Sequence, residues 1–413
     1  MTKKGENMAT LEGIQIKNFR ALKDVTLGRI LSNNKQTELP RLIAIIGANG
    51  TGKSTILDAL SFLGDCLNEG VEAACDKKHR AGFDKLRTLG VQDAMQFEIR
   101  YRREGESPIN YTLHIDCDEH GHVYVAKEEL KHKPSERKGD RGQPLTFISL
   151  KKGKGNVWAG GKKIPRNRVP IALADDQELA IDSLGAFKDY PEIQRFREFM
   201  KGWYLSYFVP ELARHTPVSG AQPHLDRTGE NLANYLQYIY REKKPEFVKM
   251  LQKLSKKIPG LERIDHDTSV QGDLFLMFYA KGFGEKPFFQ RAMSDGTLKL
   301  LAYFLLMEDP HPAPLIGIEE PENGLHHQLL SALASELKTY SARKNGPQVL
   351  LTTHSPNLVD ALTPAEVWIL DKGKDGFSTL TRAADISGVQ ALYDEEIPMG
   401  SLWYSNHLSG STA

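Results

Sequence analysis

The chain has 413 residues, of which 40% are hydrophobic and 26% are charged. This length favours two domains, or one core with a large insertion, and the composition excludes a disordered chain. No apolar run reaches the roughly 20 residues that span a bilayer, and the Lys-rich start lacks the apolar stretch of a signal peptide, so we expect a cytoplasmic protein with no membrane partner.

Cysteine usage gives no sign of a covalent framework. Cys66, Cys75 and Cys117 are too few for a set of disulfides, and they lack the C-x-x-C spacing of a zinc site. We therefore expect buried free thiols.

The first predicted elements are strands, followed by a glycine loop and a helix. Apolar and polar residues alternate in GIQIKNF (13–19), and LKDVTL (22–27) follows, so the chain opens with a pair of strands. Leu42–Ile46 is wholly apolar, as expected of a buried parallel strand. From 56 to 63, apolar residues recur at helical spacing.

Strands and then helices are predicted for the middle of the chain. Residues 95–101 and 111–116 alternate like strands, and 122–126 is a third candidate. The stretch from about 131 to 170 is rich in Gly, Pro and Lys with little periodicity, so we interpret it as a loop or β-rich excursion without a core. From about 176 to 255 the apolar spacing is helical, which indicates a helical insertion.

The last third of the chain alternates helices and strands. The predicted elements are a helix at 297–307, a strand at 315–318, a helix at 327–343 and a strand at 349–353. This alternation is typical of a parallel sheet that helices cover on both faces.

A glycine-rich loop lies between the first buried strand and the first helix. GANGTGKS, from Gly47 to Ser54, fits the P-loop pattern G-x-x-x-x-G-K-[ST] in the required context. Its backbone N–H groups and the start of the helix would surround phosphates. We expect Lys53 to bridge the β- and γ-phosphates of ATP and Ser54 to bind Mg²⁺. The expected ATP-binding residues of this loop are Gly47, Asn49, Gly50, Thr51, Gly52, Lys53, Ser54 and Thr55.

An acidic turn, residues 319–325, follows the apolar strand at 315–318. The carboxyl end of such a strand lies at the edge of the sheet where ligands bind in open α/β folds. We expect Glu319 to hold Mg²⁺ and Glu320 to orient or polarise the attacking water, since phosphoryl transfer needs positioning and charge neutralisation above all. Taken alone, the same residues could form an ordinary solvated loop.

Two more segments complete the candidate site. His354 follows the next apolar strand, 34 residues after Glu320, and is expected on a neighbouring strand tip facing the γ-phosphate. Met293–Thr297, called the signature below, precedes an apolar helix. Ser294 would cap that helix in a purely structural role; in a functional role, Ser294 and Gly296 would offer the helix N-terminus to phosphate.

The order of these motifs resembles the ABC-type ATPases of the SMC, RecF and OLD group, and most closely the small prokaryotic AAA15/AAA21-type proteins. EEPENGLH (319–326), TTHSP (352–356), IKNFRAL (16–22) and GENL (229–232) are similar to segments of that group. The resemblance implies head-to-tail dimers or higher oligomers that sandwich two ATP molecules. The signature of one chain would reach the γ-phosphate held by the other, and Asn323 and Gly324 would cross the interface.

Three further residues are assigned to the site. Glu319 stands where many relatives carry Asp, and Gln92 is preferred over Gln96 as the glutamine that would contact the metal. Arg20 would either contact the nucleotide or cap the edge of the sheet. The catalytic residues implied by the resemblance are Glu320, His354 and Lys53.

The predicted fold class is α/β: a P-loop NTPase head of ABC type with a mostly parallel sheet and an inserted α/β-to-helical subdomain. The predicted parts are the first part of the ATPase core at 9–125, an inserted basic and helical subdomain at 126–284, the second part of the core at 285–385 and a tail at 386–413.

The leading hypothesis for function is an ATPase that uses ATP and Mg²⁺ as a nucleotide-dependent dimeric switch or clamp. It would act on DNA, RNA or an effector protein in bacterial anti-phage defence, because proteins of this type often accompany a separately encoded nuclease or toxin. The alternative is a scaffold that hydrolyses ATP slowly and sequesters or activates such an effector. A transporter subunit is disfavoured by the central insertion and the signature.

The segment from Lys131 to Arg168 has twelve Lys and Arg residues and two acidic residues. Such a charge density attracts phosphate backbones. Phe147 and Trp158 lie within it and could stack on bases. The segment is either a nucleic-acid contact or a solvated loop.

Overall fold

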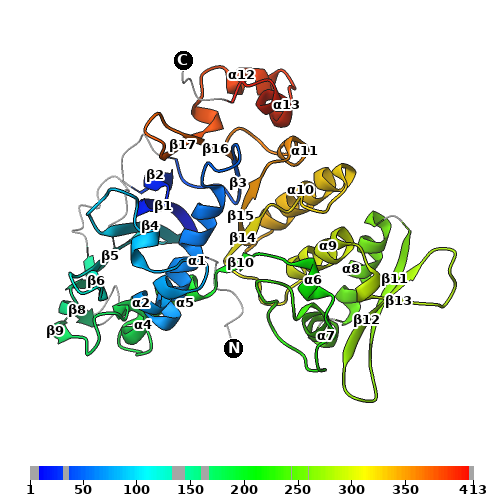
Figure 1. Ribbon diagram of the computed structural model, residues 1–413, viewed down its shortest axis with the longest axis horizontal. Helices are drawn as coiled ribbons and strands as arrows, with labels where there is room; N and C mark the ends of the chain where they lie inside the picture. The colour runs from blue at the N-terminus through cyan, green and yellow to red at the C-terminus, as the bar shows by residue number, and fades with distance from the viewer. Residues whose placement is uncertain are drawn as a thin grey trace.

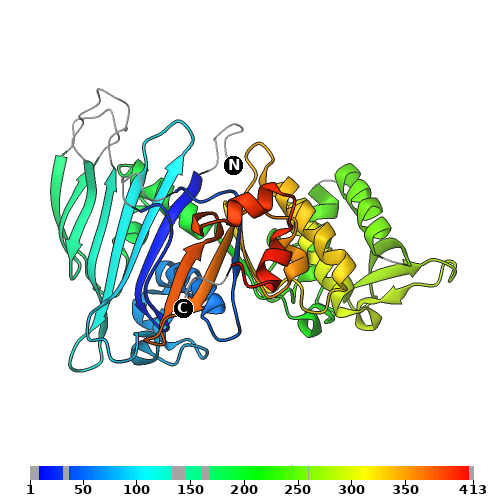
Figure 2. The ribbon, with the colours of Figure 1, turned by 90° about the horizontal axis from the view of Figure 1, so that it is seen from above.

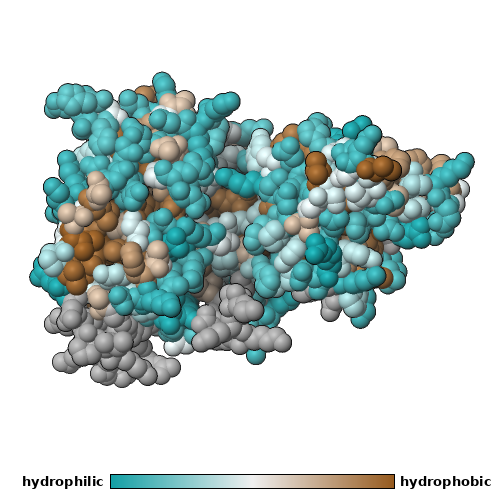
Figure 3. Space-filling view, turned by 90° about the horizontal axis from the view of Figure 1, so that it is seen from below, coloured by the Kyte–Doolittle hydropathy of each residue, from teal (hydrophilic) through white to brown (hydrophobic). Residues whose placement is uncertain are grey.

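The computed structural model of the chain describes residues 9–30, 37–132, 145–159, 167–242, 244–258 and 260–408. Two lobes flank a central, mostly parallel sheet (Figure 1). Figure 2 shows the strands of the N-terminal lobe at one end of the molecule and the helices and small sheet of the second lobe at the other. On the face drawn in Figure 3, hydrophilic residues cover most of both lobes.

An eight-stranded antiparallel sheet forms the N-terminal lobe, in the order β2-β1-β4-β5-β6-β7-β8-β9. Phe19, Phe62 and Phe97 are in contact in the core between this sheet and the helices on its inner face. The strands are β1 (Ala9–Phe19), β2 (Leu22–Gly28), β4 (Met95–Arg103), β5 (Ile109–Cys117), β6 (Val123–His132), β7 (Leu145–Lys151), β8 (Lys154–Ala159) and β9 (Asn167–Ala172). The helices of this lobe are α1 (Lys53–Glu69), α2 (Val71–Asp76), α3 (Phe83–Leu86), α4 (Ala180–Leu184) and α5 (Pro191–Lys201).

The central sheet has six strands in the order β10-β14-β15-β3-β16-β17. All neighbours are parallel except β16 and β17. Ile43 and Ile45 of β3 face the core shared with α1, whereas Ala44 and Ile46 face the core shared with α9 and α10. Burial on both faces explains why this strand is a continuous apolar run. The strands are β10 (Tyr204–Ser206), β14 (Leu315–Glu319), β15 (Gln348–Thr353), β3 (Leu42–Ile46), β16 (Val367–Lys372) and β17 (Ser378–Arg382).

The second lobe combines helices with a three-stranded sheet in the order β11-β12-β13. Its elements are α6 (Pro210–Ala213), α7 (Leu232–Glu242), α8 (Lys244–Lys257), β11 (Leu261–Thr268), β12 (Leu274–Ala280), β13 (Phe288–Phe289) and α9 (Asp295–Met307). The chain then continues through α10 (His327–Ser341), α11 (Pro356–Val359), α12 (Val389–Asp394) and α13 (Met399–Tyr404). Because α9 is packed on all sides, its residues from Gly296 to Met307 are buried.

The mixed α/β class and the mostly parallel central sheet agree with the prediction. Of the two alternatives for about 131 to 170, the β-rich excursion is what the described residues show, since β7, β8 and β9 extend the antiparallel sheet. The expectation of no core there is wrong, because Ile148, Leu150 and Val157 are buried. The division into core parts and insertion stays a prediction, and its boundary between 125 and 126 falls within β6. Cys66 and Cys75 are buried free thiols, and Cys117 is half-buried.

Within the residues that the structure describes, no helix combines the length and the apolar character needed to cross a membrane.

Candidate nucleotide site

The P-loop connects the end of β3 to the start of α1. Two of its glycines are required by close contacts. Gly47 has a φ of 153°, and a Cβ atom there would lie 2.2 Å from the carbonyl oxygen of Leu370. Gly52 precedes α1 with a φ of 104°, and a Cβ atom there would lie 2.8 Å from Oγ of Ser378. Larger residues would therefore displace the loop from the sheet.

Lys53 lies inside the P-loop, with only 5% of its surface exposed. Its Nζ atom donates hydrogen bonds to the carbonyl oxygens of Gly47 and Ala48, each at 2.9 Å. Burial lowers the pKa of the Lys53 ammonium, and the carboxylates of the acidic turn oppose this shift. The amine is thus placed at the centre of the loop that would surround phosphates.

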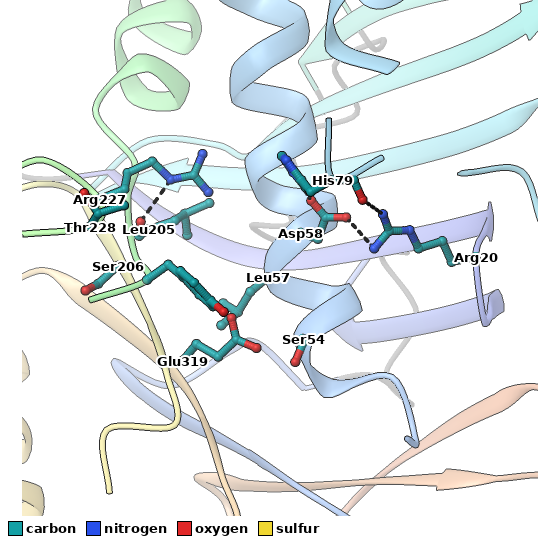
Figure 4. Close-up of a pocket in the computed structure, with 11 residues that line it drawn as sticks. Arg20, Ser54, Leu57, Asp58, His79, Leu205, Ser206, Arg227, Thr228 and Glu319 are labelled. Carbon is teal, nitrogen blue, oxygen red and sulfur yellow. Dashed lines mark hydrogen bonds and ion pairs between the residues drawn. The ribbon is translucent and has the colours of Figure 1, made fainter. Parts of the chain in front are cut away.

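A cavity of about 690 Å³ lies beside the P-loop. Ser54 of α1 and Glu319 at the end of β14 both line it, and Figure 4 shows the Glu319 side chain next to Ser54. A hydroxyl and a carboxylate are oxygen ligands of the kind that Mg²⁺ binds together with nucleotide phosphates. Ser54 and Glu319 therefore fit the predicted metal role. Among the described residues, no group of three or more His, Cys, Asp or Glu side chains could hold a metal.

Arg20 lines the same cavity but is already paired with protein groups. Its Nη1 atom lies 2.9 Å from Oδ2 of Asp58, and its Nη2 atom donates to the carbonyl oxygen of His79 at 3.1 Å (Figure 4). Asp58 also accepts a hydrogen bond from Nε of Arg80 at 3.1 Å. Asp58 was not predicted, although its position one helical turn after Ser54 places both side chains on one face of α1.

Glu320 and His354 meet at the carboxyl ends of β14 and β15, which are parallel neighbours. Nε2 of His354 lies 2.8 Å from Oε1 of Glu320, and Nδ2 of Asn323 donates to Oε2 of Glu320 at 2.8 Å. Both carboxylate oxygens of Glu320 are therefore held. The structure thus places Glu320 and His354 at neighbouring strand ends, as predicted.

Glu322 supports this pair and was not predicted to do so. Its Oε1 atom accepts hydrogen bonds from Oγ1 of Thr353, at 2.8 Å, and from the backbone N–H of His354. A side chain of the acidic turn thus fixes the backbone that presents the histidine. In the sequence, Glu322 stands two residues after Glu320 in the same turn, and this spacing could have indicated a second carboxylate with a structural role.

The signature does not join the P-loop within one chain. Ser294 is the N-cap of α9, accepts a hydrogen bond from the Thr297 N–H at 3.3 Å and is exposed. Gly296 is buried, and a Cβ atom there would lie 2.6 Å from the carbonyl oxygen of Gly324. Residues 293–297 are not among the described residues that line the cavity beside Ser54.

Gln92 lies on the exposed segment before β4, where its carbonyl oxygen accepts a hydrogen bond from Nη1 of Arg87 at 3.3 Å. Gln96 is half-buried within β4. Neither lines the cavity beside Ser54. The metal role of Gln92 stays a prediction.

The basic segment has exposed cations on its described strands. Lys151, Lys152 and Lys154 are exposed at the turn between β7 and β8. Phe147 is 1% exposed and cannot stack on a base, and the guanidinium of Arg168 lies 5.9 Å from the ring centre of Trp158. The proposed stacking by Phe147 is therefore wrong. Lys162 and Lys163 lie outside the described residues.

Comparison with known proteins agrees with this geometry. The family model described as "AAA domain, putative AbiEii toxin, Type IV TA system" matches residues 42–360. No curated protein matches the chain.

Solved structures with a similar fold include heads of SMC proteins. One is the Smc head domain with an extended coiled coil bound to the C-terminal domain of ScpA, derived from Pyrococcus furiosus, with 16% identity, a TM-score of 0.53 and coverage of 94% of this chain and 100% of that chain. Another is the SmcHead bound to the C-winged helix domain of ScpA, with 15% identity, a TM-score of 0.51 and coverage of 90% and 97%. The family match spans the P-loop, the acidic turn and His354, so the chain belongs to this AAA-domain family and has the ABC-type fold of an SMC ATPase head.

Proposed function

We propose that the chain binds and hydrolyses ATP with Mg²⁺ and works as a nucleotide-dependent dimeric switch. The observation that supports this best is the Glu320–His354 pair, held at 2.8 Å at the sheet edge next to the P-loop strand. β15, which ends one residue before this histidine, lies between β14 and β3, so both halves of the site are carried by one sheet.

Each residue has a separate role in the proposed reaction. The P-loop N–H groups and Lys53 bind the phosphates, and Ser54 and Glu319 would hold Mg²⁺, which neutralises phosphate charge when bound. Glu320 orients the attacking water and accepts its proton. His354 and Asn323 hold the Glu320 carboxylate in place, because each occupies one of its oxygens.

The proposed site is completed by a second copy of the chain. Ser294 is exposed at the N-terminus of α9, away from the cavity that Ser54 lines. A helix N-terminus favours an anion. In a head-to-tail dimer, this end would reach the nucleotide of the partner chain and make the assembled state depend on ATP.

A mixing experiment tests this arrangement. Lys53→Ala removes the P-loop cation and Ser294→Arg blocks the signature, so each variant alone should be inactive. Mixed dimers contain one site with neither defect, and random pairing should restore up to about one quarter of wild-type turnover. The control mixes Lys53→Ala with the Lys53→Ala/Ser294→Arg double variant, in which every P-loop is defective. If the first mixture is as inactive as the control, the shared-site arrangement is wrong.

The wider role that we propose is a clamp on nucleic acid or an effector protein in anti-phage defence. Support comes from the exposed lysines between β7 and β8 and from the family description, which names a toxin of a type IV system. The second candidate is a slow ATPase that acts as a scaffold, favoured because both SMC heads of similar fold hold a ScpA domain. Stimulation of turnover by DNA favours the clamp, and an ATP-dependent complex with an effector favours the scaffold.

A further inference from the structure

Lys299 is a charged residue in the interior of the second lobe. It lies on α9, five residues after the exposed N-cap Ser294, and is 5% exposed. Its Nζ atom donates hydrogen bonds to two carbonyl oxygens of the acidic turn, that of Asn323 at 2.9 Å and that of Glu320 at 3.3 Å. A buried ammonium is unfavourable unless such partners compensate it. The position of this cation therefore depends on the acidic turn.

The backbone that Lys299 holds is strained. Glu320 has a φ of 41°, in the left-handed region that residues other than glycine avoid. Its N–H donates to the carbonyl oxygen of Thr352 at 3.0 Å, and its own carbonyl oxygen accepts from the N–H of Asn323 at 3.2 Å as well as from Lys299. A strained conformation persists only where its surroundings determine it. Lys299 is thus one of the groups that hold the Glu320 backbone in the conformation that places its carboxylate next to His354.

A second contact joins the same two segments. Gly296 and Gly324 approach so closely that a Cβ atom on Gly296 would lie 2.6 Å from the Gly324 carbonyl oxygen. On the other side of the signature, Arg214 donates to the Met293 carbonyl oxygen at 3.0 Å and pairs with Asp295. The first turn of α9 and the acidic turn are therefore packed as one unit, with Lys299 as the polar link.

We propose that Lys299 is a positioning residue that couples the signature of a chain to the catalytic glutamate of the same chain. The inference rests on the proposed function, in which Ser294 contacts the nucleotide of the partner chain. A displacement of α9 on that contact passes through Lys299 to the Glu320 backbone. Each chain thus senses the partner's nucleotide through its signature and adjusts its own catalytic carboxylate, so the two ATP sites of the dimer act cooperatively.

The test compares Lys299→Met with wild type in steady-state ATPase assays over a range of ATP concentrations. Methionine keeps an unbranched apolar stem and removes the donor. We expect the affinity for ATP by calorimetry to stay within about twofold, kcat to fall about tenfold and the Hill coefficient to fall from about 2 to about 1. Lys299→Arg keeps the cation and should restore part of the cooperativity.

The matched control is Lys338→Met on α10. Lys338 also donates to a backbone carbonyl, that of Ala361 at 3.1 Å, but is far more exposed, so turnover and the Hill coefficient should not change. An unchanged Hill coefficient in Lys299→Met overturns the proposal. So does a parallel fall of melting temperature, ATP affinity and kcat, which would make the role purely structural.

Measurements on the wild-type chain distinguish a failure of this inference from a failure of the proposed function. If wild type neither hydrolyses ATP nor forms ATP-dependent dimers in light scattering, the proposed function fails. If it does both with a Hill coefficient of 1, only the coupling through Lys299 fails.

Discussion

His354 lies against Glu320, with Nε2 of the imidazole 2.8 Å from Oε1 of the carboxylate. The two residues are 34 positions apart and come from adjacent parallel strands, so the central sheet itself fixes their separation. The acidic turn and the β15 end are joined again by Glu322, which accepts hydrogen bonds from Thr353 and from the N–H of His354. The proposed catalytic pair is therefore held by the folded framework of the chain itself.

Replacing Glu320 with glutamine should separate binding from hydrolysis. The amide keeps the shape of the side chain but cannot accept the proton of the attacking water, so we expect turnover to fall at least about a hundredfold while ATP still binds. The closed dimer should accumulate, because its opening would follow hydrolysis. Light scattering with and without ATP measures this population.

The matched control is Glu308→Gln, a half-exposed carboxylate that pairs with Arg343 at 3.5 Å away from the acidic turn. It should leave turnover unchanged. The same population of oligomers with and without ATP in the Glu320→Gln chain would contradict the switch.

Lys53→Ala should abolish tight ATP binding. The Lys53 ammonium is held by two P-loop carbonyls at 2.9 Å, and in the proposed complex it binds the β- and γ-phosphates. We expect a loss of affinity of at least about a hundredfold by calorimetry, since charged hydrogen bonds to phosphate are among the strong ones. Lys23→Ala, an exposed lysine over the ring of Phe377, is the control and should bind ATP normally. Near wild-type affinity of Lys53→Ala would refute the assigned site.

The stability of the chain should depend on pH through Glu128, a buried carboxyl outside the proposed nucleotide site. Burial raises the pKa of Glu128 to about 7, against hydrogen bonds from the N–H groups of Ile181 and Ala180 and from the Tyr111 hydroxyl. The folded chain therefore binds more protons here than the unfolded chain, whose carboxyl has its ordinary pKa of about 4.3. The contribution of Glu128 to stability is fully present below pH 4.3 and is lost as the pH rises to 7.

Glu128→Gln removes this titration. Between pH 5 and pH 8, the free energy of unfolding of wild type should fall relative to that of the variant by up to about 3 kcal/mol. Denaturant titrations at both pH values measure it. A difference that does not change with pH would show that Glu128 is ionised in the folded chain throughout this range.

The sequence predicts β14, β15 and β3 of the central sheet and the residues that follow them, because these depend on local patterns, whereas β10, β16 and β17 were not predicted. Leu42–Ile46 and the strand before Glu319 are continuous apolar runs, since both faces of a parallel sheet are buried. Glu319, Glu320 and His354 directly follow such strands, so their approach to one another is fixed by topology. Their chemical roles remain predictions.

Packing between distant segments could not be predicted in the same way. Lys299 resembles any lysine of a helix in sequence, and only the contact of α9 with the acidic turn gives it carbonyl partners. Strands β7 and β8 carry polar residues such as Ser149 and Asn156, and lysines surround the turn between them, so their composition resembles a loop although Ile148 and Val157 are buried. In an antiparallel sheet of this kind, half of each strand contributes no apolar signal.

The last prediction concerns the three exposed lysines between β7 and β8. Neutralising Lys151, Lys152 and Lys154 to glutamine should weaken binding of DNA or RNA about tenfold or more without sequence preference, because cations that contact phosphates release counterions. The slope of log affinity against log salt should fall in magnitude by up to about 3. Basal ATP hydrolysis should stay unchanged, since these residues lie on the antiparallel sheet and not among those that line the nucleotide cavity.

A second triple variant controls for the loss of net charge. Lys344, Lys372 and Lys374 are exposed elsewhere on the chain, and their replacement by glutamine removes the same three charges. If the turn between β7 and β8 is the contact, only the first variant changes the salt slope, because a local contact depends on position and not on net charge. Equal weakening in both variants would indicate diffuse attraction. Unchanged binding in the first variant across a salt titration would instead favour the scaffold, in which this turn is a solvated loop or docks a protein.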